Sequence, residues 1–211
     1  TAYLKAYYPE HFMASVMSSE LGNTDKIYAL TQECSRMGIK VLKPNIVSSS
    51  KRFLVNDQNE IEYGLGAIKG VADTFIKHVC ESRKNRQFRD LWDFSKKVDI
   101  KLGGKKSLEA LSQSGAFDSL SPSRSIAIAC VEDMLKDGSL QNGENLKSGD
   151  LFADFDESFD PYEKYKNIQN LTLSEKLELE KKSLGYYLSG HPVIAIENKV
   201  SRIRANKISD L

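Results

Sequence analysis

The sequence predicts a mainly α-helical chain with a minor β element, an α+β arrangement. Apolar residues recur at helical spacing through most of the chain, capping residues stand at the ends of these stretches, and the only runs typical of strands are short. The 211 residues are 40% apolar, which suits a packed core in one large domain or two small ones.

Two helices are expected near the N-terminus. Pro9 suits the first position of a helix, and apolar residues at four-residue spacing carry that helix to about residue 21. Asn23 or Thr24 can cap a second helix, for which Gly38 supplies a left-handed stop. Residues 2–8 are typical of the last turns of a helix, and since the sequence begins without Met, we expect an excised fragment.

Three short runs of β-branched and aromatic residues follow, at Ile39–Leu42, Phe53–Asn56 and Ile61–Tyr63. The last two flank residues 57–59, a turn-forming Asp-Gln-Asn cluster. A small β-hairpin is therefore expected.

Short helices dominate the remainder. Ser121, just ahead of Pro122, predicts the start of a helix that runs toward Gly138. Residues 141–170 have little periodicity and many acidic and small polar residues, so we interpret them as a surface linker. Residues 172–175 have the form of a capping box that opens a final charged helix.

Charge is segregated along the sequence although the net charge is only +1. Residues 69–106 carry eleven Lys or Arg against five Asp or Glu, whereas residues 132–163 carry ten acids against two Lys. The basic block can meet phosphate groups, and the acidic block would be repelled by them. The alternative is that both blocks are solvated faces.

Cysteine and histidine residues give no sign of a metal or a disulfide framework. The three cysteines are widely separated and indicate reduced core thiols: Cys34, Cys80 and Cys130. The three histidines form no pair at metal-ligand spacing. No apolar stretch approaches the roughly 20 residues of a membrane span. We expect no bound metal, no membrane contact and a cytoplasmic location.

A glycine-rich turn at residues 63–72 follows the plan of a helix-hairpin-helix. Gly70 permits positive φ, and amides at the start of the next helix can receive one DNA phosphate. The predicted backbone-binding residues here are Lys69, Gly70, Val71 and Ala72. Contact would be independent of base sequence and sensitive to salt. Alternatively, the glycines merely connect a hairpin to a helix.

A second, weaker copy of this plan lies at residues 108–118, with its turn at Ser114 and Gly115. These two residues are also candidate contacts to the DNA backbone. Phe117 is expected to be buried between helices, which favours a packing role for this copy.

An apolar pair, Leu151 and Phe152, interrupts the acidic linker. Burial of these two side chains in a partner's pocket would gain about 3 to 6 kcal/mol before ordering costs. The alternative is that they fasten the linker to its own domain. Residues 154–156 have an Asp-x-Asp form, but this polar linker lacks the rigid strand that a two-metal site needs. No residue set for nucleophilic catalysis is present, so no catalytic residue is expected.

The sequence resembles the alpha subunit of bacterial DNA polymerase III, the C-family replicative polymerase. Five segments carry the resemblance: residues 1–14, 33–39, 63–71, 114–118 and 184–192. The resemblance implies four parts: residues 1–63 end the polymerase fingers, 64–140 form a tandem helix-hairpin-helix module, 141–170 are an acidic linker with a clamp-binding peptide, and 171–211 are helical and lead to a further domain.

The clamp-binding peptide implied by the resemblance comprises Ser148, Asp150, Leu151 and Phe152. Ser148 stands where the family usually has Gln, which implies weaker clamp binding. Ala72 stands where the family's hairpin often has a second Gly, which implies weaker phosphate contact at that position.

The resemblance also implies the partners: duplex DNA, the sliding clamp (beta subunit) and other holoenzyme subunits. Catalytic Mg²⁺ would belong to a palm upstream, so this fragment alone needs no cofactor and is not expected to polymerise. Two other interpretations remain open: a protein-interaction scaffold whose hairpins only pack, and a fragment of a DNA-repair ligase or nuclease.

Overall fold

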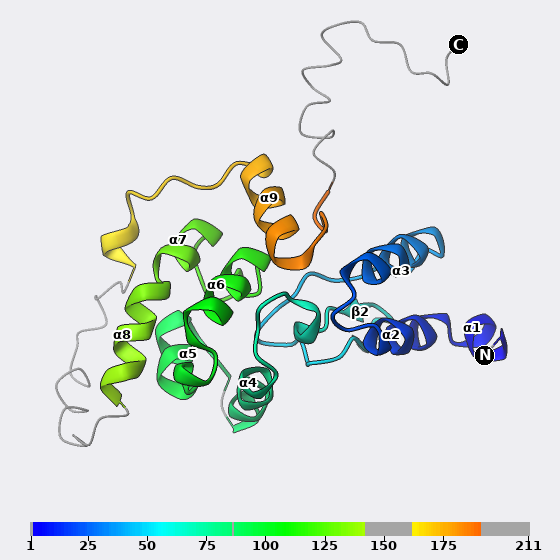
Figure 1. Cartoon of the computed structure of the whole chain (residues 1–211), viewed down its shortest axis with the longest axis horizontal. Helices are drawn as coiled ribbons and strands as arrows, with labels where there is room; N and C mark the ends of the chain where they lie inside the picture. The colour runs from blue at the N-terminus through cyan, green and yellow to red at the C-terminus, as the bar shows by residue number, and fades with distance from the viewer. Residues whose placement is uncertain (1, 86, 142–161, 191–211) are drawn as a thin grey trace, which may run out of the picture.

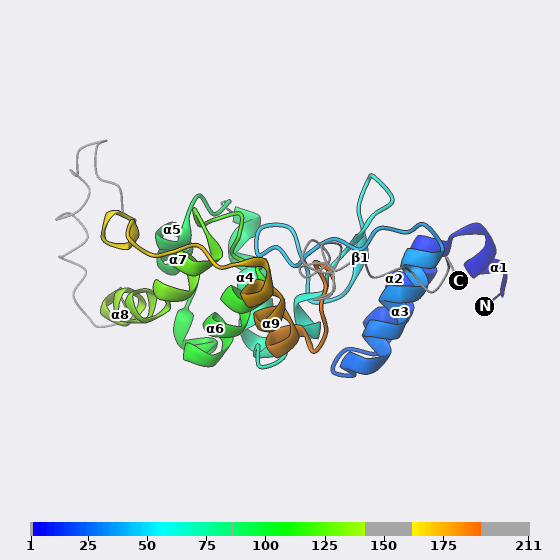
Figure 2. The same cartoon turned by 90° about the horizontal axis from the view of Figure 1, so that it is seen from above.

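The computed structural model describes residues 2–85, 87–141 and 162–190. Three helices occupy one end of the molecule (Figures 1 and 2): α1 Ala2–Tyr7, α2 Pro9–Ser19 and α3 Thr24–Arg36. Pro9 opens α2 as expected. The Asn23 side chain caps α3 by accepting a hydrogen bond from the Lys26 amide at 3.2 Å. Gly38 ends this region with φ +74°, which confirms the left-handed stop.

The expected β-hairpin is present as two antiparallel strands, β1 Leu54–Val55 and β2 Ile61–Glu62. The connecting turn includes Asn59 with a positive φ of 58°. The prediction of a third strand was wrong, since residues 39–42 contribute only an isolated parallel bridge between Val41 and Ile61. Pro44 follows closely and has no amide hydrogen with which to extend the ladder.

Short helices around one aromatic centre form the middle of the molecule. The elements are η1 Leu65–Ala67, α4 Asp73–Asn85, α5 Leu91–Lys97, η2 Ile100–Leu102 and α6 Gly104–Ser114. The buried ring of Phe94 makes edge-on contacts with Phe88 and Phe117, each at 5.1 Å between centroids, and with Phe75 at 6.5 Å. These rings join α4, α5 and the end of α6 into one core.

The single helix expected after Ser121 is divided into two, α7 Arg124–Ala129 and α8 Val131–Gln141. The cap is Ser123, whose hydroxyl accepts from the Ile126 amide at 3.3 Å. The break at Cys130 lets α7 pack on α6 while α8 also reaches α5 and η2. The amphipathic stretch is therefore divided into two helices because its two halves pack against different neighbours.

The C-terminal described segment runs back along this helical group (Figure 1). It contains η3 Glu163–Tyr165 and α9 Leu173–Leu184, which packs on α6. Within the predicted linker, the hydroxyl of Tyr162 donates to the Leu120 carbonyl at 2.9 Å, so residues 162–170 are joined to the domain. The capping box is confirmed, because Thr172 accepts from the Glu175 amide while Glu175 accepts from the Thr172 amide.

All three cysteines are free. Cys34 and Cys130 are buried, and this burial raises the pKa of each thiol to about 11. Cys80 is only half-buried, so it differs from the core thiol expected of it. Within the described residues, no helix is long and apolar enough to cross a membrane. The same residues contain no His, Cys, Asp and Glu cluster suited to a metal ion.

Candidate nucleic-acid interface

The first glycine-rich turn separates its glycines into two roles. Gly64 and Gly66 lie against the backbone of residues 51–53, and a Cβ on either would approach the Lys51 carbonyl oxygen to 2.9 Å. These two glycines therefore serve close packing. Gly70 is exposed, has φ +87°, and precedes the N-terminus of α4. Only Gly70 has the turn geometry that the helix-hairpin-helix interpretation requires.

Backbone amides around Gly70 are divided between internal bonds and solvent. The Lys69 amide donates to the Ser183 carbonyl at 2.8 Å, and the Ala72 amide donates to the Ser107 hydroxyl at 3.3 Å. The Val71 amide reaches the Ile68 carbonyl at 3.5 Å. In the described part of the chain, the amides of Gly70, Asp73 and Thr74 have no hydrogen-bond partner. These three are available to an acceptor at the positive end of the α4 dipole.

Two lysines flank this turn. Lys69 is exposed, and its Nζ lies against Gly185. A Cβ atom on Gly185 would be 3.0 Å from this Nζ. Lys106, also exposed, lays its side chain over Gly70, with Cε 3.0 Å from the place of a Cβ on that glycine. Sequence reasoning singled out Lys69 and missed Lys106. The available signal was the basic block, which Lys106 terminates.

The second turn is covered by other parts of the chain. Ser114 is 1% exposed, and Gly115, with φ +84°, ends α6 in the left-handed conformation. A Cβ on Gly115 would come within 2.1 Å of Nη2 of Arg124. Phe117 is fully buried, as expected. This arrangement agrees with the packing role that the sequence favoured for the second copy.

A buried ion-pair network covers the second turn. Arg124 donates two hydrogen bonds to Asp118, at 3.1 and 2.6 Å, and a third to Glu180 at 3.3 Å. The Arg124 and Glu180 side chains are 3% and 1% exposed. Burial opposes the charge on Arg124, but the hydrogen bonds and charges of Asp118 and then Glu180 still raise its pKa. The sequence alone did not indicate this network.

Glu180 also holds the segment that follows α9. Its carboxylate accepts from the Leu188 and Ser189 amides at 3.0 and 2.8 Å and from the Ser189 hydroxyl. Because Ser183 accepts from the Lys69 amide, α9 is bonded to the first turn as well as to the second. The helix thus sets the position of both turns relative to each other.

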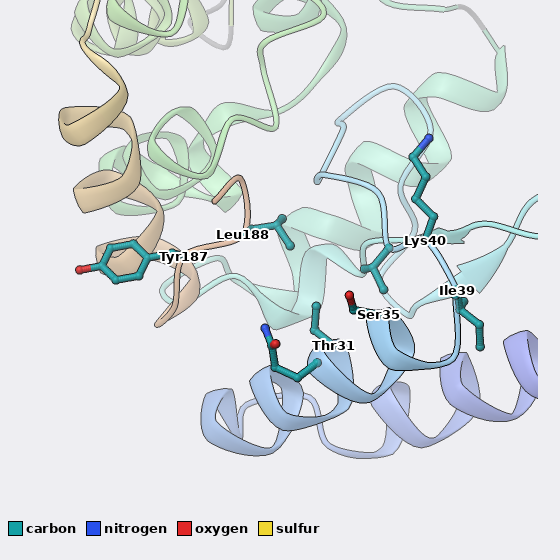
Figure 3. A pocket seen from close by; sticks show the side chains of 9 residues that line it. Thr31, Ser35, Ile39, Lys40, Tyr187 and Leu188 are labelled. Carbon is teal, nitrogen blue, oxygen red and sulfur yellow. The ribbon is translucent and has the colours of Figure 1, made fainter. Parts of the chain in front are cut away.

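Two pockets near these elements differ in charge. A pocket of about 400 Å³ lies between α3 and the segment after α9 (Figure 3). The only ionic side chain in its lining is Lys40, whose charge is neutralised by Glu60 at 2.7 Å. The Tyr187 ring at its edge lies under Nζ of Lys181, 5.4 Å away. A second pocket, along α4, is strongly basic and lies beside the first turn.

The predicted clamp-binding residues Ser148, Asp150, Leu151 and Phe152 lie outside the described residues, as does the Asp-x-Asp sequence at 154–156.

A family model matches part of the chain. Residues 38–127 match the helix-hairpin-helix motif, and this range includes both turns. With its exposed glycine turn ahead of α4, the chain is a mainly helical protein that carries a helix-hairpin-helix motif.

Similarity to known proteins extends along the whole chain. It is 37% identical over 230 residues to DNA polymerase III subunit alpha of Pseudomonas fluorescens, covering 100% of this chain and 20% of that protein. The corresponding subunit of Pasteurella multocida is 40% identical over 215 residues, with 100% and 18% covered. That of Escherichia coli K12 is 39% identical over 205 residues, with 96% and 18% covered.

The chain belongs to the family of bacterial DNA polymerase III alpha subunits, of which it spans about one fifth of the length. The resemblance found in the sequence is thereby confirmed.

Proposed function

We propose that this chain holds duplex DNA by its phosphate backbone, without reading base sequence, as a non-catalytic part of a replicative DNA polymerase. The observation that carries the proposal is the exposed Gly70 turn ahead of α4, where the amides of Gly70, Asp73 and Thr74 have no hydrogen-bond partner among the described residues. One phosphate oxygen can accept from these amides while Lys69 and Lys106 add charge.

The other residues predicted to contact the DNA backbone have a structural role in this proposal. The amides of Val71 and Ala72 are used within the chain, so these residues shape the turn. Ser114 and Gly115 lie in the covered second turn, so they too have a structural role. The parent protein, of which this chain spans a part, would supply the nucleotidyl transfer and its Mg²⁺ from regions beyond this chain. The class of partner is therefore a DNA duplex, bound for processive synthesis.

The test is a titration of the full chain with duplex DNA over a series of salt concentrations. We expect log affinity to fall linearly with log salt, and two unrelated duplexes of equal length to bind equally. Lys69→Gln with Lys106→Gln should lower the steepness of that line by about 1, since the two lysines neutralise the one phosphate held at the turn.

A control variant removes the same charge elsewhere. Lys26→Gln with Lys136→Gln changes exposed lysines on α3 and α8, at opposite ends of the molecule (Figure 1), and should keep the original slope. Absence of duplex binding at every salt concentration would favour the interaction scaffold and overturn the proposal.

We further propose that the linker peptide Ser148, Asp150, Leu151 and Phe152 binds the sliding clamp. The support is the family membership together with an apolar pair in acidic sequence. Such a tether makes re-engagement with DNA intramolecular and so raises the effective concentration of the polymerase. Other holoenzyme subunits would contact regions beyond this chain.

Phe152→Ala is expected to weaken clamp binding at least tenfold, about 1.4 kcal/mol, because it removes most of the apolar area offered to the pocket. Surface plasmon resonance on immobilised clamp measures the dissociation constant. Phe155→Ala, three residues further on, is the matched control. Equal dissociation constants for Phe152→Ala and the unsubstituted chain would show that this peptide is not the clamp-binding site.

A further inference from the structure

A basic pocket of about 610 Å³ lies along α4, on the side of the residue 50–51 segment. It opens beside the Gly70 turn, because Asp73 and Thr74 belong both to its lining and to the start of α4. Its lining includes Lys51, Asp73, Thr74, Lys77, Arg83 and Lys84.

Arg83 builds one wall of this pocket. Its guanidinium donates to the carbonyls of Ile46 and Ser49 at 3.1 and 2.6 Å, and to the Ser50 hydroxyl at 3.5 Å. These neutral partners fix the segment that carries Ser50 and Lys51 against α4. Among the described residues, no carboxylate forms an ion pair with Arg83, so its positive charge is not neutralised.

The lining has four basic side chains and one carboxylate. Asp73 pairs with Lys51 at 2.7 Å. Lys77 and Lys84 form no ion pair with any described residue. Thr74, Lys77 and Lys84 lie at three- and seven-residue intervals, so α4 presents them on one side. The pocket is thus a concave surface with unneutralised cations, which favours an anion.

We propose that this pocket is a second phosphate-binding site for the DNA backbone, in which Lys77 and Lys84 hold a phosphodiester adjacent to the one at the Gly70 turn. The inference rests on the proposed function and extends it from the hairpin to the length of α4. The N-terminus of α4 would receive one phosphate through amides, and the lysines further along would receive the following one through charge.

Cys80 supplies a local reporter of occupancy, because it is half-buried in the lining while the other two cysteines are buried. Burial raises the pKa of Cys34 and Cys130 to about 11, so near pH 8 a maleimide should modify Cys80 far faster than either of them. Peptide mass mapping after brief labelling confirms which thiol has reacted.

The experiment measures the labelling rate of Cys80 in the full chain, without DNA, with saturating duplex DNA, and with inorganic pyrophosphate. We expect duplex DNA to slow labelling at least tenfold. Lys77→Gln with Lys84→Gln should abolish this protection and lower the steepness of the salt dependence by about 1, since the two lysines neutralise one phosphate, whereas Lys26→Gln with Lys136→Gln should change neither. Circular dichroism verifies that each variant is folded.

Duplex binding with unprotected Cys80 would overturn the second site and leave the proposed function intact. Protection by pyrophosphate but not by DNA would also overturn it, because the site would then serve a small free phosphate compound. A chain that binds no duplex at all would overturn the proposed function and the second site together.

Discussion

Glu180→Ala is expected to lower the free energy of unfolding by about 3 to 5 kcal/mol, the cost of removing one partner from a buried ion pair. Glu180 is 1% exposed and accepts from Arg124, from two backbone amides and from the Ser189 hydroxyl. The alanine variant leaves these donors without their acceptor while Arg124 keeps its pairing with Asp118. Chemical denaturation followed by circular dichroism measures the change.

A neighbouring glutamate on the same helix provides the control. Glu178 is exposed, so Glu178→Ala should change stability by less than about 0.5 kcal/mol. Glu180→Gln keeps acceptor capacity without the charge and should fall between the two. If Glu180→Ala is as stable as Glu178→Ala, the network does not hold the C-terminal segment in place.

Gly115→Ala is expected to destabilise the fold by about 4 to 6 kcal/mol, since two costs combine. A left-handed conformation costs a non-glycine residue about 1 to 2 kcal/mol. In addition, the new Cβ would lie 2.1 Å from Nη2 of Arg124, which must move away from Asp118 and Glu180. The same denaturation measurement reports the loss.

Gly22→Ala separates these two costs. Gly22 also has a left-handed φ, +93°, but a Cβ there meets nothing within 4 Å. Its substitution should therefore cost only about 1 to 2 kcal/mol. The combination of Gly115→Ala with Glu180→Ala should cost less than the two single changes together, because both disrupt the same ion pair. Equal effects of Gly115→Ala and Gly22→Ala would show that Arg124 yields freely.

The sequence by itself determined the elements whose signals are local. Pro9, the Asn23 cap, the stop at Gly38 and the Thr172 capping box act within one or two helical turns, and each is found where it was expected. The β-hairpin and the Gly70 turn were likewise predictable because their residues are adjacent in the chain. The resemblance, carried by short ordered segments, also identified the family.

Only the tertiary structure decided which of these elements are exposed and which are covered. The Arg124 bond to Glu180 joins residues 56 positions apart, and the Lys69 amide bonds to the carbonyl of Ser183, far along the chain. Contacts at such separation cover the second turn, leave the first open and bring Lys106 over Gly70. The two similar glycine turns differ in exposure because the burial of a segment depends on what packs against it. The residue spacing within a segment carries no information about which distant residues those are.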